Sequence, residues 1–155
     1  MIHFTHGDLL HTPDPFIAQG VAVGSQEGLG TGLALKISKK YPLAQKEFKA
    51  FTRNGAFKGG DVFVSSKHES YPQIMYIATQ PDMYHATLSF LNKGLRNLVK
   101  WCEKYSIERV SLPKIGCGLG KLDWEREVKP LLVQHCTESS TLFTIYEEFR
   151  NDYEG

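Results

Sequence analysis

Residues Leu112 to Trp124 read LPKIGCGLGKLDW, and this stretch decides how the whole chain is interpreted. Three glycines and one cysteine occupy positions 116–120, after a strand-like run and before a helix-like one. A second cluster, GSQEGLGTG at 24–32, has the same context. Glycine lets backbone amides approach a ligand closely, and the amino terminus of a following helix attracts anions. Two such loops on one edge of a sheet predict a site that grips two neighbouring phosphates.

Glycine-rich turns are also common connectors, and this simpler explanation stays open. Neither cluster fits the P-loop pattern GxxxxGK[ST], which disfavours a nucleoside triphosphatase. The first cluster also lacks the acidic residue that completes a dinucleotide-binding fingerprint, because Asp61 lies too far along the chain. The sequence therefore favours a phosphate site of another kind.

Hydrophobic periodicity predicts strands that alternate with helices. Leu88, Leu91, Leu95 and Leu98 repeat at helical spacing and predict a helix over 87–105. Further helices are expected at about 30–40 and 124–136, and one more helical turn within 44–57, after a stop at Pro42. The expected strands are 1–4, 16–23, 61–65, 74–79, 109–112 and 141–146, with a hairpin joining the third and fourth. This order predicts a three-layer α/β/α fold with a mixed sheet, and 155 residues fit a single domain over 1–155.

Composition bounds the partners and the compartment. Eighteen basic and 17 acidic residues leave a formal charge of +1, so a nucleic-acid partner is not expected, although a local basic patch stays open. No apolar run approaches the roughly 20 residues that span a bilayer, and the start MIHFTHGDLL lacks the features of a secretory signal. Cys102, Cys117 and Cys136 form no CxxC pair, which argues against a disulfide framework or a metal cluster. We expect a reduced, cytoplasmic protein without a metal.

Four segments resemble the macrodomain family, the ADP-ribose-binding α/β/α module. They are GDLL at 7–10, GLGTGLALKISKKYP at 28–42, PKIGCGLGKLDW at 113–124 and TLFTIYEEF at 141–149. These segments fall in register over nearly the whole chain and place it near terminal ADP-ribose protein glycohydrolase and the ADP-ribose-1″-phosphate phosphatases. The resemblance implies ADP-ribose, or an ADP-ribosylated molecule, as the ligand, and it implies no cofactor.

The resemblance also assigns binding roles to individual positions. Asp8, followed by Leu9, matches an aspartate that accepts from the adenine amino group, and a plain turn-forming aspartate is the alternative. The matching loop positions are Ser25, Gly30, Thr31 and Gly32 in the first loop and Gly116, Cys117, Gly118, Leu119 and Gly120 in the second. Tyr146 matches a side chain near adenine, although an aromatic residue on a last strand is more often core. Cys117 is expected to act through its small size and its amide, because no adjacent base is evident.

Two departures from the family pattern bear on catalysis. The glycohydrolase has a lysine after the threonine of the strand that matches 74–79, and an aspartate in the second glycine-rich loop; here these positions hold Gln80 and Gly120. An amide is not a nucleophile and glycine has no carboxylate, so we expect no lysine mechanism. The catalytic candidates are then Asp123, Ser25 and Gln80, of which Asp123 is also well placed to cap the next helix.

Two classes of function follow from the resemblance. The first is hydrolysis of a distal-ribose derivative of ADP-ribose, either the 1″-phosphate or an ester-linked ADP-ribosyl group on a protein. The second is a module that binds ADP-ribose without turnover. The missing lysine and aspartate favour the module, whereas a small stand-alone domain favours the enzyme.

Overall fold

A six-stranded sheet forms the centre of the molecule. The computed structural model describes residues 1–23, 32–54, 56–69, 71–82, 85–117 and 120–149. The strands lie in the order β1-β6-β5-β2-β4-β3. Their bounds are Ile2–Gly7 for β1, Phe16–Ala22 for β2, Val62–Val64 for β3, Gln73–Gln80 for β4, Arg109–Pro113 for β5 and Leu142–Phe149 for β6. β3 runs antiparallel to β4 and all other neighbours are parallel, so the predicted mixed sheet is confirmed.

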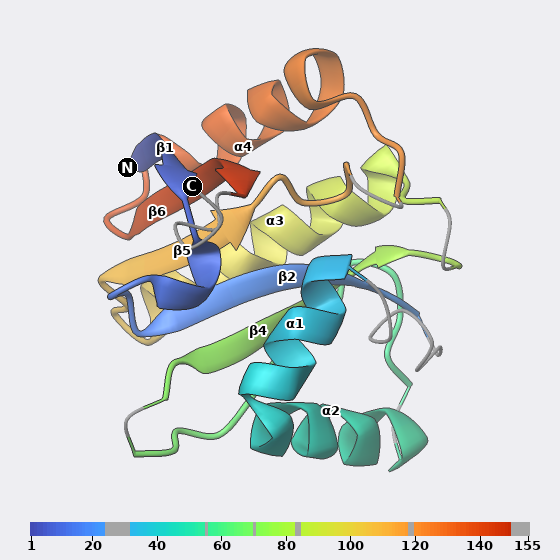
Figure 1. The fold of residues 1–155 in the computed structure, drawn as a ribbon. Helices are drawn as coiled ribbons and strands as arrows, with labels where there is room; N and C mark the ends of the chain where they lie inside the picture. Colours follow the sequence, from blue (N-terminus) through green and yellow to red (C-terminus); the bar gives the residue numbers. More distant parts are fainter. Residues whose placement is uncertain (24–31, 55, 70, 83–84, 118–119, 150–155) are drawn as a thin grey trace.

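Helices cover both faces of this sheet (Figure 1). α1 (Gly32–Lys40) and α2 (Pro42–Asn54) lie on one face, and α3 (Leu88–Lys104) and α4 (Lys129–Cys136) lie on the other. Two short elements complete the described chain, a 3-10 turn η1 (Leu9–His11) and a π-helical turn η3 (Trp124–Val128). The result is the predicted three-layer α/β/α arrangement.

Each face of the sheet has its own core. Ile37 and Phe48 pack with β2 and β4 on the α1–α2 side. Leu91, Leu95 and Leu132 pack with β4, β5 and β6 on the α3–α4 side. Because both faces of β2 and β4 are covered, these strands read as nearly continuous apolar runs and show no alternation.

The second helix is longer than the sequence indicated. In place of one turn within 44–57, α2 has 13 residues and begins at Pro42. Proline is well tolerated at the first helical position, where its missing N–H would have no intrahelical partner. Pro42 therefore ends α1 and starts α2 at once, and an interpretation of proline as a stop signal captures only half of that role.

The helix expected at 124–136 begins with the π-helical turn η3. The Asp123 side chain accepts a hydrogen bond from the Arg126 amide at 2.9 Å, and the Asp123 amide donates to Glu127 Oε1 at 2.9 Å. The predicted capping role of Asp123 is confirmed by this reciprocal pair.

Candidate functional site

The two glycine-rich segments leave the sheet from neighbouring parallel strands. β2 leads into the first segment and β5 into the second, and the two strands pair directly. β1 and β6 are parallel to them, so the carboxyl ends of all four strands share one edge. Ligands of open α/β sheets bind outside this edge. Residues 24–31, with Ser25, Gly30 and Thr31, lie outside the described residues, and α1 begins at Gly32 directly after them.

The second segment folds back tightly on itself. The Leu122 amide donates to the Gly116 carbonyl oxygen at 3.0 Å, and the Ala86 amide donates to the Gly120 carbonyl oxygen at 2.9 Å. Gly116 has φ +80°, and a Cβ atom at Gly120 would lie 2.6 Å from the Gly116 oxygen. Both described glycines are therefore needed by the turn itself. Gly118 and Leu119 lie outside the described residues.

Cys117 has the properties of a small structural residue. Its amide donates to the Lys114 carbonyl oxygen at 3.2 Å, so a diphosphate would compete with that carbonyl for the same donor. Burial raises the pKa of its thiol to about 11; Lys114 opposes this shift, and Asp123 adds to it. The nucleophile in cysteine chemistry is the thiolate. A thiol that stays protonated at neutral pH agrees with the interpretation of Cys117 as a residue chosen for its size.

Asp8 has two protein partners at the end of β1. Its side chain is 7% exposed, accepts from the Leu10 amide at 2.9 Å, and has Oδ2 3.2 Å from His11 Nδ1. It therefore caps η1, as the alternative interpretation of this aspartate expects. The side chain of Leu9 is buried in the core beneath α1 and α2, so a ligand could reach only its main chain.

Tyr146 lies at the same corner as Asp8. It is half-buried on β6, pairs in register with Thr5 and Pro113, and packs at the margin of the α1–α2 core. A Cβ atom at Gly7 would lie 3.7 Å from Tyr146 Cε2, so the ring covers the turn that precedes Asp8. The fold thus brings Asp8 and Tyr146 together, although 138 positions separate them in the sequence.

The catalytic candidates are occupied in other ways. The side-chain amide of Gln80 donates to the Asp82 carbonyl oxygen at 2.9 Å, and the Asp123 side chain caps η3 as described above. Each of these side chains has a structural partner already, and Ser25 is not described.

One pair of side chains at this edge, Asp82 and His85, was not predicted from the sequence. His85 Nδ1 lies 3.3 Å from Asp82 Oδ1, and the same oxygen accepts from the His85 amide at 2.9 Å. The pair follows β4, and the next residue, Ala86, is hydrogen-bonded to Gly120 in the second loop. Histidine held by a carboxylate is a common proton-transfer arrangement. The sequence contains this pair as DxxH after a predicted strand, but that spacing alone is too common to identify a functional pair.

Among the described residues, no three His, Cys, Asp or Glu side chains gather closely enough to hold a metal ion. None of the described helices has both the length and the apolar character that a membrane span requires.

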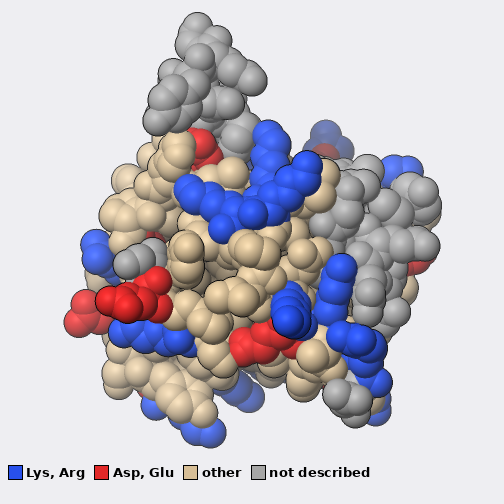
Figure 2. Space-filling view, turned by 60° about the horizontal axis from the view of Figure 1, so that its bottom comes forward, with Lys and Arg blue, Asp and Glu red and all other residues tan. Residues whose placement is uncertain are grey.

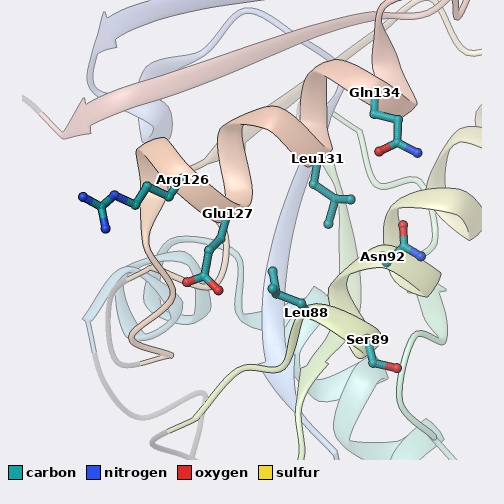
Figure 3. A pocket seen from close by; sticks show the side chains of 7 residues that line it. All are labelled: Leu88, Ser89, Asn92, Arg126, Glu127, Leu131 and Gln134. Atoms are coloured by element: carbon teal, nitrogen blue, oxygen red, sulfur yellow. The ribbon is translucent and has the colours of Figure 1, made fainter.

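A groove of about 500 Å³ lies elsewhere, between the start of α3 and the η3–α4 segment (Figure 3). Leu88 and Leu131 line it together with both charges, Arg126 and Glu127. It shares no residue with the two glycine-rich segments. The opposed charges give it no preference for an anion, so the strand edge is the better candidate for a phosphate ligand.

Comparison with known proteins identifies the family. The model of the Macro domain matches residues 22–130. This chain belongs to the macrodomain family. Among curated macrodomain proteins, the human ADP-ribose glycohydrolase OARD1 is 29% identical over 119 residues, which cover 76% of this chain and 73% of that protein. The Mycobacterium tuberculosis DNA ADP-ribosyl glycohydrolase is 28% identical over 131 residues, but this chain spans only 36% of its length.

Solved macrodomain structures agree with the fold described above. The macrodomain of Mycobacterium tuberculosis DarG has a TM-score of 0.83 at 26% identity, covering 94% of this chain and 97% of that one. Thermosipho africanus DarTG in complex with ADP-ribose has a TM-score of 0.84 at 20% identity, covering 96% of this chain and 41% of that one. The predicted family and fold class are therefore confirmed, whereas the individual site residues stay predictions.

Proposed function

We propose that this macrodomain binds ADP-ribose at the carboxyl edge of its sheet and hydrolyses a derivative that carries a group on the distal ribose. The proposal rests on one observation: two glycine-rich segments follow the adjacent parallel strands β2 and β5. A diphosphate between them would meet main-chain amides and the positive end of α1. Asp8 and Tyr146, at the end of β1 and on β6, are the side chains proposed for the adenine end.

The proposed substrates are ADP-ribose-1″-phosphate and an ester-linked ADP-ribosyl group on a protein. In either case water attacks the anomeric carbon of the distal ribose, the bond from that carbon to the leaving oxygen breaks, and the leaving phosphate or carboxylate keeps the bonding electrons. The water loses a proton in this step, which calls for a nearby base. His85, oriented by Asp82, is the candidate base that the geometry favours over Asp123 and Gln80. The names of the relatives OARD1 and DNA ADP-ribosyl glycohydrolase support a glycohydrolase reaction.

A binding module without turnover is the second candidate. It is favoured by Gln80 at the position of the family's lysine and by Gly120, whose surroundings leave no room for a carboxylate side chain. A module of this kind would use the same loops and the same adenine corner.

A single set of assays separates the two candidates. Pure protein is incubated with ADP-ribose-1″-phosphate and, separately, with mono-ADP-ribosylated protein, and released phosphate or ADP-ribose is measured against heat-inactivated protein. Calorimetry measures ADP-ribose binding on the same sample. We expect saturable binding and release from at least one substrate. Binding without release would replace the enzyme by the module, and the absence of binding would reject both.

A further inference from the structure

The charges of the chain are unevenly distributed over its surface. α1 and α2 together carry Lys36, Lys39, Lys40, Lys46, Lys49 and Arg53 against one acidic residue, Glu47, although the whole chain has a formal charge of only +1. Figure 2 brings the lower side of Figure 1, with α2, to the front, and Lys and Arg outnumber Asp and Glu there. We call the six basic residues the α1–α2 face. A near-neutral net charge therefore conceals one strongly basic surface.

Three of the six basic residues of this face form no ion pair with a carboxylate of the described residues. The carboxylate of Glu47 accepts from the Ser66 amide at 2.9 and 2.7 Å and from the Ser66 hydroxyl group. Among the described residues, no ion pair joins Lys39, Lys46 or Arg53 to a carboxylate. All three residues are exposed.

The spacing of these basic residues also lowers the stability of α1 and α2 when no anion is bound to them. Lys46 and Lys49 are three apart on α2, Lys49 and Arg53 are four apart, and α1 repeats both spacings among its lysines. Like charges at these spacings are neighbours on a helix and destabilise it. Only Lys39 and Lys40, in the last turn of α1, and Arg53, in the last turn of α2, are favoured by the helix dipole. A polyanion bound along this face would remove the repulsion.

Exposed aromatic rings accompany the basic residues. Tyr71 is 53% exposed and packs edge-on against Tyr41 at 5.8 Å, and Lys40 Nζ lies 5.7 Å from the centre of the same Tyr41 ring. Phe51 on α2 is 39% exposed, and one side of its ring stacks on Phe63 with 4.5 Å between the ring centres. Basic side chains interleaved with exposed rings are the pattern that binds single strands, because the rings stack on bases while the cations contact phosphates.

We propose that the α1–α2 face binds single-stranded nucleic acid without sequence preference. The exposed rings favour this partner over an acidic protein segment or an anionic membrane, for which charge alone would suffice. The surface is separate from the edge that carries the proposed ADP-ribose site, but α1 begins at that edge, so a bound strand would pass beside it. The inference does not depend on hydrolysis of any ADP-ribose derivative.

The test is fluorescence anisotropy with a labelled 20-nucleotide oligothymidine and a labelled RNA of mixed sequence, titrated with the full chain between 50 and 200 mM salt. One variant combines Lys39→Gln, Lys46→Gln and Arg53→Gln. Its matched control combines Arg96→Gln, Lys100→Gln and Lys104→Gln on α3, which removes the same charge from exposed positions on the opposite face. Circular dichroism melting and ADP-ribose calorimetry show that each variant is folded.

We expect wild-type binding to weaken steeply with salt. Three phosphate contacts on a single strand give a slope near two in the logarithm of affinity against the logarithm of salt, or roughly a 20-fold loss between 50 and 200 mM. The α1–α2 variant should lose that part of the slope and the control should keep it. Tyr71→Ser should weaken binding about tenfold at constant salt slope, because it removes stacking and no charge.

Three results would overturn the proposal. The first is no binding at 50 mM salt, and the second is an equal loss in the α1–α2 variant and its control. The third is binding to phosphatidylserine vesicles, or displacement of the oligonucleotide by polyglutamate, that is weakened in the α1–α2 variant and unchanged in Tyr71→Ser. This result would assign the face to a membrane or an acidic protein.

Discussion

Replacing Gly120 by alanine tests whether the second glycine-rich segment is as tight as its geometry indicates. The added Cβ atom would lie 2.6 Å from the Gly116 oxygen and 2.8 Å from the Ala86 Cβ. The first neighbour is backbone, so the clash cannot be relieved by a side-chain rotation. Overpacking of this kind costs about 1 to 3 kcal/mol.

The same substitution strains two hydrogen bonds that close the turn. These are the bonds from the Leu122 amide to Gly116 and from the Ala86 amide to Gly120, at 3.0 and 2.9 Å. Losing part of each, at about 0.5 to 1.5 kcal/mol per bond, brings the expected loss of unfolding free energy to about 2 to 4 kcal/mol. Urea unfolding followed by circular dichroism measures it, with an unchanged m-value as evidence that only stability has changed.

A second substitution separates the two clashes. In the pair Gly120→Ala with Ala86→Gly, the Cβ contact at 2.8 Å is gone but the backbone contact at 2.6 Å stays. A double-mutant cycle with the single Ala86→Gly variant should therefore show favourable coupling of about 1 kcal/mol, with recovery that is incomplete. If Gly120→Ala unfolds within 0.5 kcal/mol of the wild type, the tight turn and the reasoning from it are wrong.

Three further predictions address the candidate site. Asp8→Asn keeps an oxygen that can accept from the Leu10 amide, so stability should change by less than about 1 kcal/mol while ADP-ribose binding, measured by calorimetry, weakens by about 1 to 3 kcal/mol; unchanged affinity would remove Asp8 from the adenine site. The His85 side chain is 64% exposed, and His85→Ala should lower any turnover at least a hundredfold without loss of ADP-ribose binding. The control His3→Ala, at another exposed histidine, should leave turnover unchanged. Equal rates in the two variants would exclude His85 as the base. Burial raises the pKa of Cys117 from 9.0 to about 11. Iodoacetamide at pH 8 should therefore modify this thiol about a hundredfold more slowly in the folded chain than in urea. The contribution of the thiol to stability should be full below pH 9 and should be lost as the pH rises through 11. Equal modification rates for this residue in the two states, read by mass spectrometry, would contradict that shift.

Local patterns predicted most of the elements because their signals are short-range. The leucine repeat gave α3 almost to the residue, with Thr87 as the cap whose hydroxyl accepts from the Phe90 amide. The order of the strands was not predictable, because parallel pairing of β1 with β6 joins the two ends of the chain and no local signal encodes it. The same limit applies to the corner of Asp8 and Tyr146, which only the family resemblance brought together before the fold was known.

The distribution of charge illustrates a different limit. A net charge of +1 correctly excludes a global field, but it averages over surfaces that face different ways. Once α1 and α2 are placed on the same side of the sheet, their six basic residues belong to one face. Composition can therefore exclude a uniformly basic protein but cannot exclude a basic surface.

The geometry at Gly120 bears on the aspartate that the glycohydrolase pattern has in the second glycine-rich loop. Any side chain at this position would overlap the Gly116 oxygen, so an aspartate could not be introduced without opening the turn. In the correspondence that the family resemblance implies, the loop as it folds here leaves no room for the carboxylate of the glycohydrolase. A proton-transfer group, if this macrodomain turns over its ligand, has to come from another segment that reaches the same edge. The segment from Asp82 to Ala86 meets that condition, because its last residue is hydrogen-bonded to Gly120 and its first holds His85 in place.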